Sequence, residues 1–551
     1  SKLSGQGGVV YPDSDTPETV YDYSGKNTVV YRHDSADPTM IQGGDFIVKK
    51  AASGSAITLV TGSEGIKAGF KDTDSAADRN KVSAVLNKLA NKLYYSGYAK
   101  EKNLTGVVRI AEGLTASSAS AAVGKEGEIT FSDGTGEGLS AGQGYYAYVP
   151  DSEVVYKTGP ITDSEKISET RKDEEGTVYV KAVNPNADSE KYVSALYAAG
   201  TADKANPMKV RMDGKNLDLN AASADKIAAA VYVTDNAHVE ILNNAKDKTL
   251  SIHASNTDTR AANGILSKGS YSSLHMEGPV EISNIMTAGD GAAGISVDGQ
   301  NSEVILDGTL TVKNVSGKRE QGRGQNAAGI RVVGDNSSVS VTGPVDLSGI
   351  KGSSLRTTGA DTEISVGGGT ITAAKDEDKS HNYYAARVDK GTININMKDG
   401  KAGTNTTKIT GDMYVTDQYG KKVVEYTGGA LVDCKDAGKL NVALTDKDSF
   451  WTGVAAYDQY NDSYGPGGNT MHDIGEFNLY LANGASWTNE QQAHVTTGTL
   501  DEDKQVWKGS QLASLHGGSD EAHAGIIYQK HEDPIFIENY SGHARVFDDH
   551  K

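Results

Sequence analysis

GILSKGSYSSLHMEGPVEISNI (Gly264–Ile285), GISVDGQNSEVILDGTLTVKNV (Gly294–Val315) and GIRVVGDNSSVSVTGPVDLSGI (Gly329–Ile350) are three copies of one pattern. The copies begin 30 and 35 residues apart, and only the segment that follows the pattern changes length. A fourth copy begins at Ser354 and slips by one residue after Gly368. The stretch is therefore a unit that is repeated along the chain.

Within each copy, apolar residues stand two apart with polar residues between them, which is typical of short strands with one buried face. The apolar positions are Ile265, Leu274, Met276, Val280, Ile282, Ile285, Ile295, Val304, Leu306, Leu310, Val312, Val315, Ile330, Val339, Val341, Val345, Leu347 and Ile350. Three strands and three bends make one coil, and a coil of this size must stack on its neighbours to bury its core. The pattern predicts an all-β chain, a three-sided parallel β-helix, with glycine at bends that need a positive φ.

Composition restricts the class of function. The 551 residues carry a formal charge of −19, which argues against nucleic acid or an anionic membrane as partner. The only cysteine, Cys434, is in phase with Val432 and is expected in the core. The sequence contains no run of about 18 apolar residues, and its first residues do not read as a signal peptide, as expected of a processed or truncated extracellular segment.

Three regions are expected. Residues 1–205 are expected to form an N-terminal β-helical part with a helix over about 75–96, and its charged stretch 152–203 is expected as an insertion or a set of long loops. Residues 206–430 form regular coils, and 431–551 form the last coils and a cap. The helix is indicated by a capping box at Ser75 and by apolar residues at helical spacing.

The end of the chain resembles the passenger domains of Gram-negative autotransporters, the proteins of type V secretion. The resemblance lies in LNVALTDKDSFWTG (Leu440–Gly453), LYLANGASW (Leu479–Trp487) and FIENYSGHARVFDDH (Phe536–His550). The helix-containing stretch Asn80–Ser120 is similar to a module of large surface autotransporters.

This resemblance implies a right-handed β-helix exported through the periplasm and the outer membrane to the bacterial cell surface. It also implies an autochaperone-like role for the last coils and an outer-membrane β-barrel in the full-length protein. The implied function is adhesion to host or bacterial surfaces through glycans, matrix proteins or self-association, as in biofilms and virulence.

A polysaccharide lyase or hydrolase on the same scaffold is the alternative. Pairs of acids exist at 433 and 436, 446 and 448, and 548 and 549, but with 73 acids in the chain such pairs are expected by chance. The GLSAG match at Gly138–Gly142 lacks the strand and helix that a nucleophile elbow needs. No metal-binding spacing is present, so neither a metal nor a cofactor is expected. A cleft lined by two or three acids would favour the enzyme.

Tyrosine is the dominant aromatic residue, with 27 copies against 7 Phe and 3 Trp. It is favoured on recognition surfaces because it joins a rigid ring to a polar tip. The loop YDQYNDSYGPGG cannot continue a strand, so we expect it to project and to bind a glycan or a protein. The candidate ligand-binding residues are Tyr457, Asp458, Gln459, Tyr460, Asn461, Asp462 and Tyr464, with Tyr383 and Tyr384 as a second cluster. The alternative for all these rings is packing within the coils.

Overall fold

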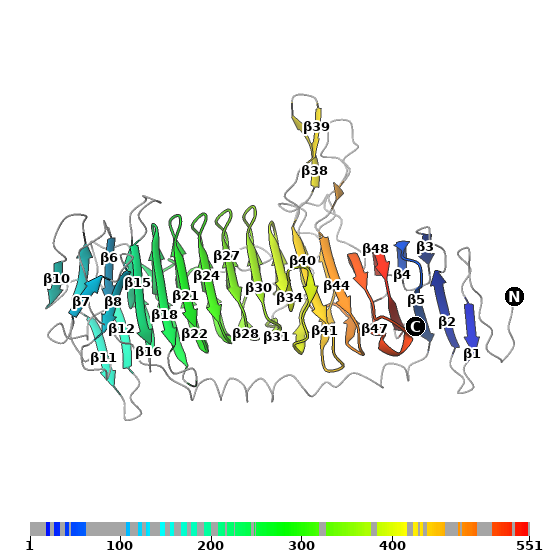
Figure 1. The fold of residues 1–551 in the computed structure, drawn as a ribbon, viewed down its shortest axis with the longest axis horizontal. Helices are drawn as coiled ribbons and strands as arrows, with labels where there is room; N and C mark the ends of the chain where they lie inside the picture. Colours follow the sequence, from blue (N-terminus) through cyan, green and yellow to red (C-terminus); the bar gives the residue numbers. More distant parts are fainter. Residues whose placement is uncertain are drawn as a thin grey trace. The chain divides into compact units, whose positions relative to one another are not determined.

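The structure is a computed structural model (Figure 1). It describes residues 18–21, 27–33, 39–42, 46–61, 106–110, 120–123, 128–132, 144–148, 155–158, 167–172, 178–184, 192–199, 208–214, 217–224, 226–243, 247, 249–318, 327–375, 383–415, 422–427, 430–433, 438–457, 472–473, 476–492, 510–531 and 535–548. The expected helix over about 75–96, the GLSAG match and Cys434 lie outside these residues.

The chain divides into two compact units. The expected boundaries at 205 and 430 stay a prediction. One unit is residues 77–366, and the other joins residues 1–76 to residues 367–551. The first residues of the chain therefore belong with its last ones rather than with the coils that follow them in sequence.

Unit 77–366 is a parallel β-helix in which each full coil gives one strand to each of three sheets. The first sheet contains β6 (Gly106–Ile110), β9 (Gly144–Tyr148), β10 (Val155–Thr158), β13 (Tyr192–Val193), β14 (Leu196–Ala199), β17 (Ile227–Thr234), β20 (Ala262–Lys268), β23 (Ala292–Val297), β26 (Ala328–Val332) and β29 (Ser353–Thr357). The second contains β7 (Ser120–Val123), β8 (Glu128–Ser132), β15 (Met208–Gly214), β18 (Ala237–Asn243), β21 (Ser273–Glu277), β24 (Glu303–Asp307), β27 (Ser338–Val341) and β30 (Glu363–Val366). The third contains β11 (Ile167–Lys172), β12 (Val178–Asn184), β16 (Leu217–Ser223), β19 (Leu250–Asn256), β22 (Val280–Thr287), β25 (Leu310–Gly317) and β28 (Val345–Ile350).

The register confirms the repeat. Ile265 pairs with Ile295, Ile295 with Ile330, and Ile330 with Leu355, so equivalent positions of successive coils stack. Every apolar position of the three copies is buried, with at most 3% of its surface exposed. The three-sided parallel β-helix is therefore the observed fold of this unit.

The sequence predicts that the repeat glycines stand at bends with a positive φ, and this prediction is wrong for the first glycine of each copy. Gly264, Gly294 and Gly329 lie within strands, and their φ angles are not in the positive range. A Cβ on Gly294 would lie 2.6 Å from the carbonyl oxygen of Gly329 and 2.7 Å from Val312. Glycine is needed here because the next coil approaches too closely for a side chain, and Gly308 alone among the six repeat glycines has a positive φ, of 122°.

The stretch 152–203, expected as an insertion or a set of long loops, contains strands among its described residues. It contributes β10 to β14, and several of these strands are antiparallel to their neighbours: β9 with β10, β6 with β14, and β11 with β12. Each of the three sheets of this unit thus ends in a hairpin: β9 with β10 in the first sheet, β7 with β8 in the second, and β11 with β12 in the third. The outer strands β10, β7 and β11 are short, with 4, 4 and 6 residues, which limits the strand edge left open for unwanted pairing.

In the other unit the first sheet is short and the remaining two are long. The first contains β32 (Tyr384–Val388), β37 (Met413–Val415) and β42 (Ala455–Tyr457). The second contains β3 (Thr39–Gln42), β4 (Phe46–Ala51), β33 (Thr392–Ile395), β40 (Lys439–Leu444), β44 (Glu476–Leu481), β46 (Gln511–His516) and β48 (Ile535–Ser541). The third contains β1 (Glu18–Tyr21), β2 (Asn27–His33), β5 (Ser55–Thr61), β31 (Gly369–Thr372), β36 (Thr407–Thr410), β41 (Phe450–Gly453), β45 (Ser486–Asn489), β47 (Gly525–Gln529) and β49 (His543–Asp548). Two minor strands, β34 (Met397–Lys398) and β35 (Lys401–Ala402), pair with each other, and η4 (Glu521–His523) is a single 3-10 turn.

Aromatic side chains stack inside these coils. The rings of Trp451 and Trp487 are nearly parallel, with centroids 4.8 Å apart, and Phe477 stacks on Trp451. Each indole N–H donates to a backbone carbonyl, of Gly411 and Gly453 respectively, at 2.9 Å. Both tryptophans are fully buried, so the stack is part of the core.

A small sheet stands away from the coils of this unit (Figure 1). It consists of β38 (Lys422–Thr427), β39 (Ala430–Asp433) and β43 (His472–Asp473), all antiparallel.

Candidate functional site

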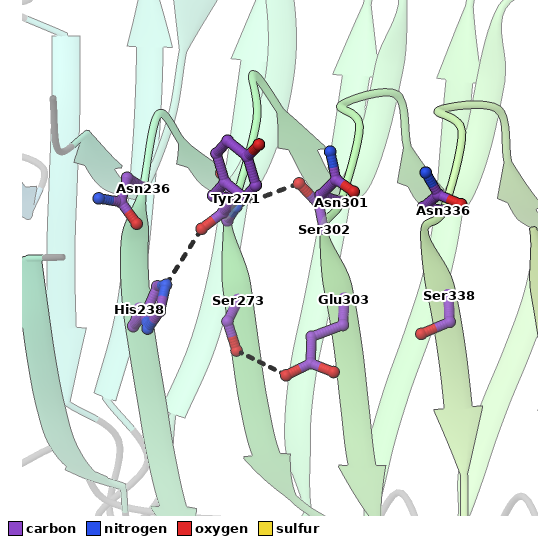
Figure 2. A pocket seen from close by; sticks show the side chains of 10 residues that line it. Asn236, His238, Tyr271, Ser273, Asn301, Ser302, Glu303, Asn336 and Ser338 are labelled. Carbon is purple, nitrogen blue, oxygen red and sulfur yellow. Dashed lines mark hydrogen bonds between the residues drawn. The ribbon is translucent and has the colours of Figure 1, made fainter. Parts of the chain in front are cut away.

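A shallow pocket lies on the outer face of unit 77–366, where four strands of the second sheet begin (Figure 2). It encloses about 280 Å³ and is open to solvent. Its lining is polar: Asn236, His238, Tyr271, Ser272, Ser273, Asn301, Ser302, Glu303, Asn336 and Ser338. Figure 2 shows these side chains as rows that run across β18, β21, β24 and β27.

The upper row consists of residues in the left-handed backbone conformation. Their φ angles are 60° at Asn236, 59° at Tyr271, 51° at Asn301 and 57° at Asn336. The next coil continues the row with Asp361, at 52°. Asn and Asp tolerate this conformation because their short polar side chains bond locally, whereas an aromatic residue there is an outlier.

The neighbouring coils hold Tyr271 in this conformation. Its N–H donates to the carbonyl of Gln300 at 3.0 Å, and its own carbonyl accepts from Nε2 of His238 at 3.1 Å. The left-handed conformation costs a residue of this kind ~1–2 kcal/mol. A strained residue of this kind is a reason to look for a function. The strain at Tyr271 places a half-buried tyrosine ring where the other coils have an amide or a carboxylate.

Buried hydroxyls fix the backbone beneath this row. The N–H of Ser272 donates to Oγ of Ser302 at 3.1 Å, and the N–H of Ser302 donates to Oγ of Ser337 at 3.0 Å. Oγ of Ser302 in turn donates to the carbonyl of Gly269 at 3.2 Å. The three serines are at most 2% exposed, so buried hydrogen bonds hold the turn beneath the pocket in these three coils.

The sequence holds a signal for this turn that the alternation of apolar residues does not reveal. A glycine, any residue, a left-handed residue and a serine or threonine recur as GSYS, GQNS, GDNS and GADT, beginning at Gly269, Gly299, Gly334 and Gly359. The tyrosine in the first of these breaks the asparagine pattern, and that break marks the pocket.

The lower row supplies donors and acceptors but only one acid. Oγ of Ser273 lies 3.4 Å from Oε1 of Glu303, which is exposed to solvent. Because the carbonyl of Tyr271 can only accept, Nε2 of His238 carries the proton of their bond. A glycosidase needs two carboxyl groups on opposite sides of the bond it cleaves, and this pocket has a single one.

A second constellation resembles a catalytic triad. Nε2 of His253 lies 3.1 Å from Oδ2 of Asp218, and Nδ1 lies 3.1 Å from Oγ of Ser283. Nδ1 also lies 3.0 Å from the backbone carbonyl of Ser283, which can only accept. Both ring nitrogens therefore act as donors, so His253 cannot take a proton from Ser283.

The electrostatics of His253 agree with this assignment. Burial alone would lower its pKa, but the hydrogen bond and charge of Asp218, with smaller contributions from Ser283 and Glu281, raise the pKa above its ordinary value. Ser283 is also only 2% exposed and so is closed to a substrate. The constellation ties three coils together and is not a nucleophilic site.

The acids at 446 and 448 are likewise explained by a turn. Oδ1 of Asp446 accepts from the N–H of Asp448 and from Oγ of Ser449, at 2.9 and 3.0 Å. Its Oδ2 accepts from Oγ1 of Thr406 at 2.7 Å, which joins two coils. Among the described residues, no group of three or more His, Cys, Asp or Glu is placed to share a metal ion.

Of the two predicted tyrosine clusters, the structure describes the pair Tyr383 and Tyr384 but not most of the loop that begins at Tyr457. Tyr383 and Tyr384 are buried, with 5% and 9% of their surface exposed, and the ring of Tyr384 stacks on Tyr414 at 5.0 Å. This burial favours the packing alternative for the pair. The backbone of Tyr457 ends β42, while Asp458, Gln459, Tyr460, Asn461, Asp462 and Tyr464 lie outside the described residues. Binding by that loop stays a prediction.

Comparison of the chain with protein-family models, with curated proteins and with solved structures finds no match in any of the three. Over the stretches that the structure describes, no helix combines the length and the apolar character needed to cross a membrane.

Proposed function

We propose that this protein is an extracellular adhesin displayed on a bacterial surface, and that the pocket at Tyr271 binds a glycan. The observation that carries the proposal is the left-handed Tyr271, which places an aromatic ring beside amides, hydroxyls and one carboxylate. Export through the outer membrane by way of a β-barrel, and the right-handed sense of the coils, are parts of the proposal that rest on the resemblance of the C-terminal sequence.

The chemistry of the pocket suits a sugar. A tyrosine ring offers an apolar face with a polar tip, and the amides of Asn301 and Asn336 offer both donors and acceptors to hydroxyl groups. The single exposed acid, Glu303, and the formal charge of −19 favour a neutral glycan over an anionic one.

The size of the pocket indicates weak binding at one site. Its ~280 Å³ is just below the ~300–1,000 Å³ of most small-molecule sites, so it suits about one sugar ring. We expect a Kd on the order of 1 mM, about −4 kcal/mol. Display of many copies on one cell would raise the overall strength by avidity without any new contact.

A glycan array probed with wild-type protein and with the Tyr271→Asn variant tests the proposal. Asparagine restores the residue of the neighbouring coils, so the variant should fold while it loses most of the binding. Asp361→Asn is the matched control, since it changes the same row outside the pocket and should bind as wild type. Unchanged binding by Tyr271→Asn would place the binding surface elsewhere.

The polysaccharide-active enzyme remains the second candidate function. Incubation of the protein with the polysaccharides that it binds, followed by an assay for reducing ends and unsaturated products, separates the two. Product formation that Glu303→Gln abolishes would support the enzyme. We expect no product, because the described pocket offers a single carboxylate.

A further inference from the structure

The first strands of the chain complete its last coil. β4 pairs in parallel with β48, from Phe46 with Ile535 to Ala51 with Tyr540. β5 pairs in parallel with β49, from Ala56 with His543 to Thr61 with Asp548. We name residues 39–61, which contain β3, β4 and β5, the end segment.

Side chains and turns reinforce this pairing. The hydroxyl of Tyr540 donates to the carbonyl of Ala56 at 2.8 Å, and Tyr540 is only 3% exposed. The N–H of Ala52 donates to the carbonyl of Tyr540, and the N–H of Ala56 to the carbonyl of Gly542, at 2.9 and 3.1 Å. Ile57 is 1% exposed, so the end segment contributes to the core as well as to the edge.

The strands of the end segment pair with few others. β3 pairs with β4, β5 pairs with β2, and the remaining partners are β48 and β49. Residues 62–105 separate β5 from β6, the next described strand, which belongs to the other unit. None of these pairings requires that the end segment and the last coil belong to the same molecule.

We propose that the end segment exchanges between molecules, so that the partner of this surface is a second copy of the chain. The end segment of one copy lies on β48 and β49 of the next, in the register seen here. Every copy carries one end segment and one acceptor edge, which is formed by β48 and β49. Such a head-to-tail contact can propagate into chains of copies.

The end segment can pair with the last coil of its own molecule, which we call the closed form, or with that of another copy, which we call the exchanged form. Mass action decides between the two. The contacts are identical in both, so only the effective concentration of the chain's own end segment competes with that of neighbouring copies. The effective concentration generally falls as more residues separate two segments, and residues 62–105 alone separate the end segment from the next described strand. Exchange should therefore grow with protein concentration and be greatest where copies are crowded.

Cross-linking between copies tests the proposal. Thr58 and Arg545 are paired residues on neighbouring parallel strands, a spacing that a disulfide can bridge. Full-length Thr58→Cys and Arg545→Cys variants, each with Cys434→Ser, are mixed, concentrated, diluted and oxidised. We expect disulfide-linked heterodimers at a yield at least about tenfold above a control mixture of Thr58→Cys with Lys401→Cys, because Lys401 is exposed and lies outside this pairing.

The double variant Thr58→Cys with Arg545→Cys in one chain supplies the second measurement. Oxidised at low concentration, it should form the disulfide within one molecule and then stay monomeric at every concentration. If it cross-links within the molecule while the mixture gives only the control yield, the segment does not exchange and the proposal is wrong. Failure to cross-link in either form would contradict the pairing itself. Tyr271→Asn should leave the heterodimer yield unchanged, so this result does not depend on glycan binding.

Discussion

Tyr271→Asn should make the protein more stable while it removes glycan binding. The tyrosine holds a φ of 59°, and asparagine occupies the same conformation at 236, 301 and 336. The left-handed conformation costs a non-glycine residue ~1–2 kcal/mol, and Asn bears less of this cost than Tyr. The backbone bonds to Gln300 and His238 do not depend on the side chain and should survive the change.

The loss of the half-buried ring offsets part of this gain. We expect the free energy of unfolding to rise by about 0.5–1 kcal/mol, from the relief of backbone strain less the lost ring contacts. Tyr271→Ala is the matched variant, because it also removes the ring but leaves a residue that disfavours the left-handed conformation. It should be about 1 kcal/mol less stable than Tyr271→Asn.

Urea unfolding followed by circular dichroism measures both differences, and hydrogen exchange of the amides in β21 and β24 reports them locally. If Tyr271→Ala and Tyr271→Asn unfold at the same urea concentration, backbone strain at this residue is not stored as we argue. A Tyr271→Asn variant less stable than wild type by more than about 1 kcal/mol would show that the ring is mainly a packing residue.

Three further predictions concern the core, pH and the tyrosine loop. Leu306→Asp should destabilise by several kcal/mol because it buries an unpaired charge in a fully enclosed position, whereas Leu306→Met should cost less than about 1.5 kcal/mol; urea midpoints would decide. Folding raises the pKa of His253, so the contribution of this group to stability is full below the unfolded pKa and is lost as the pH rises through the folded pKa. The urea midpoint of the wild-type protein should therefore fall as the pH rises above about 6.5. The variant His253→Gln should show a smaller fall over the same pH range. Replacing Tyr457, Tyr460 and Tyr464 by serine should lower adhesion of cells that display the protein and leave the Tm nearly unchanged, and a lower Tm with intact adhesion would show that these rings are packing.

The core could be predicted from the sequence because it follows a local rule. Alternation with period two placed Leu306 and its equivalents in the interior, and stacking of identical coils follows from their repetition. The physical reason that position 294 requires glycine could not be predicted from the sequence, because the carbonyl that excludes a Cβ there belongs to Gly329 in another coil. A bend and a close approach both select glycine, and only the stacked coils tell them apart.

The pocket and the pairing of the chain ends needed the structure for different reasons. Tyr271 differs from its counterparts only in the residue type that occupies a left-handed position, a signal visible once the turn motif is aligned coil by coil. The contact of Tyr540 with Ala56 joins residues 484 apart, and no periodic pattern links them. Alternation of apolar residues can indicate that a segment is a strand, but it carries no information on which sheet edge β4 and β5 complete.

The pairing of the first strands with the last coil also sets an order in time. β4 and β5 precede their partners β48 and β49 in the chain, and these partners appear only after residues 62–534 have been synthesised. At the usual rates of translation this delay is on the order of a minute, long compared with the microseconds in which a hairpin forms. β4 and β5 thus reach their final partners only after this delay, and throughout the wait their unpaired edges are open to chaperones, proteases and other nascent chains.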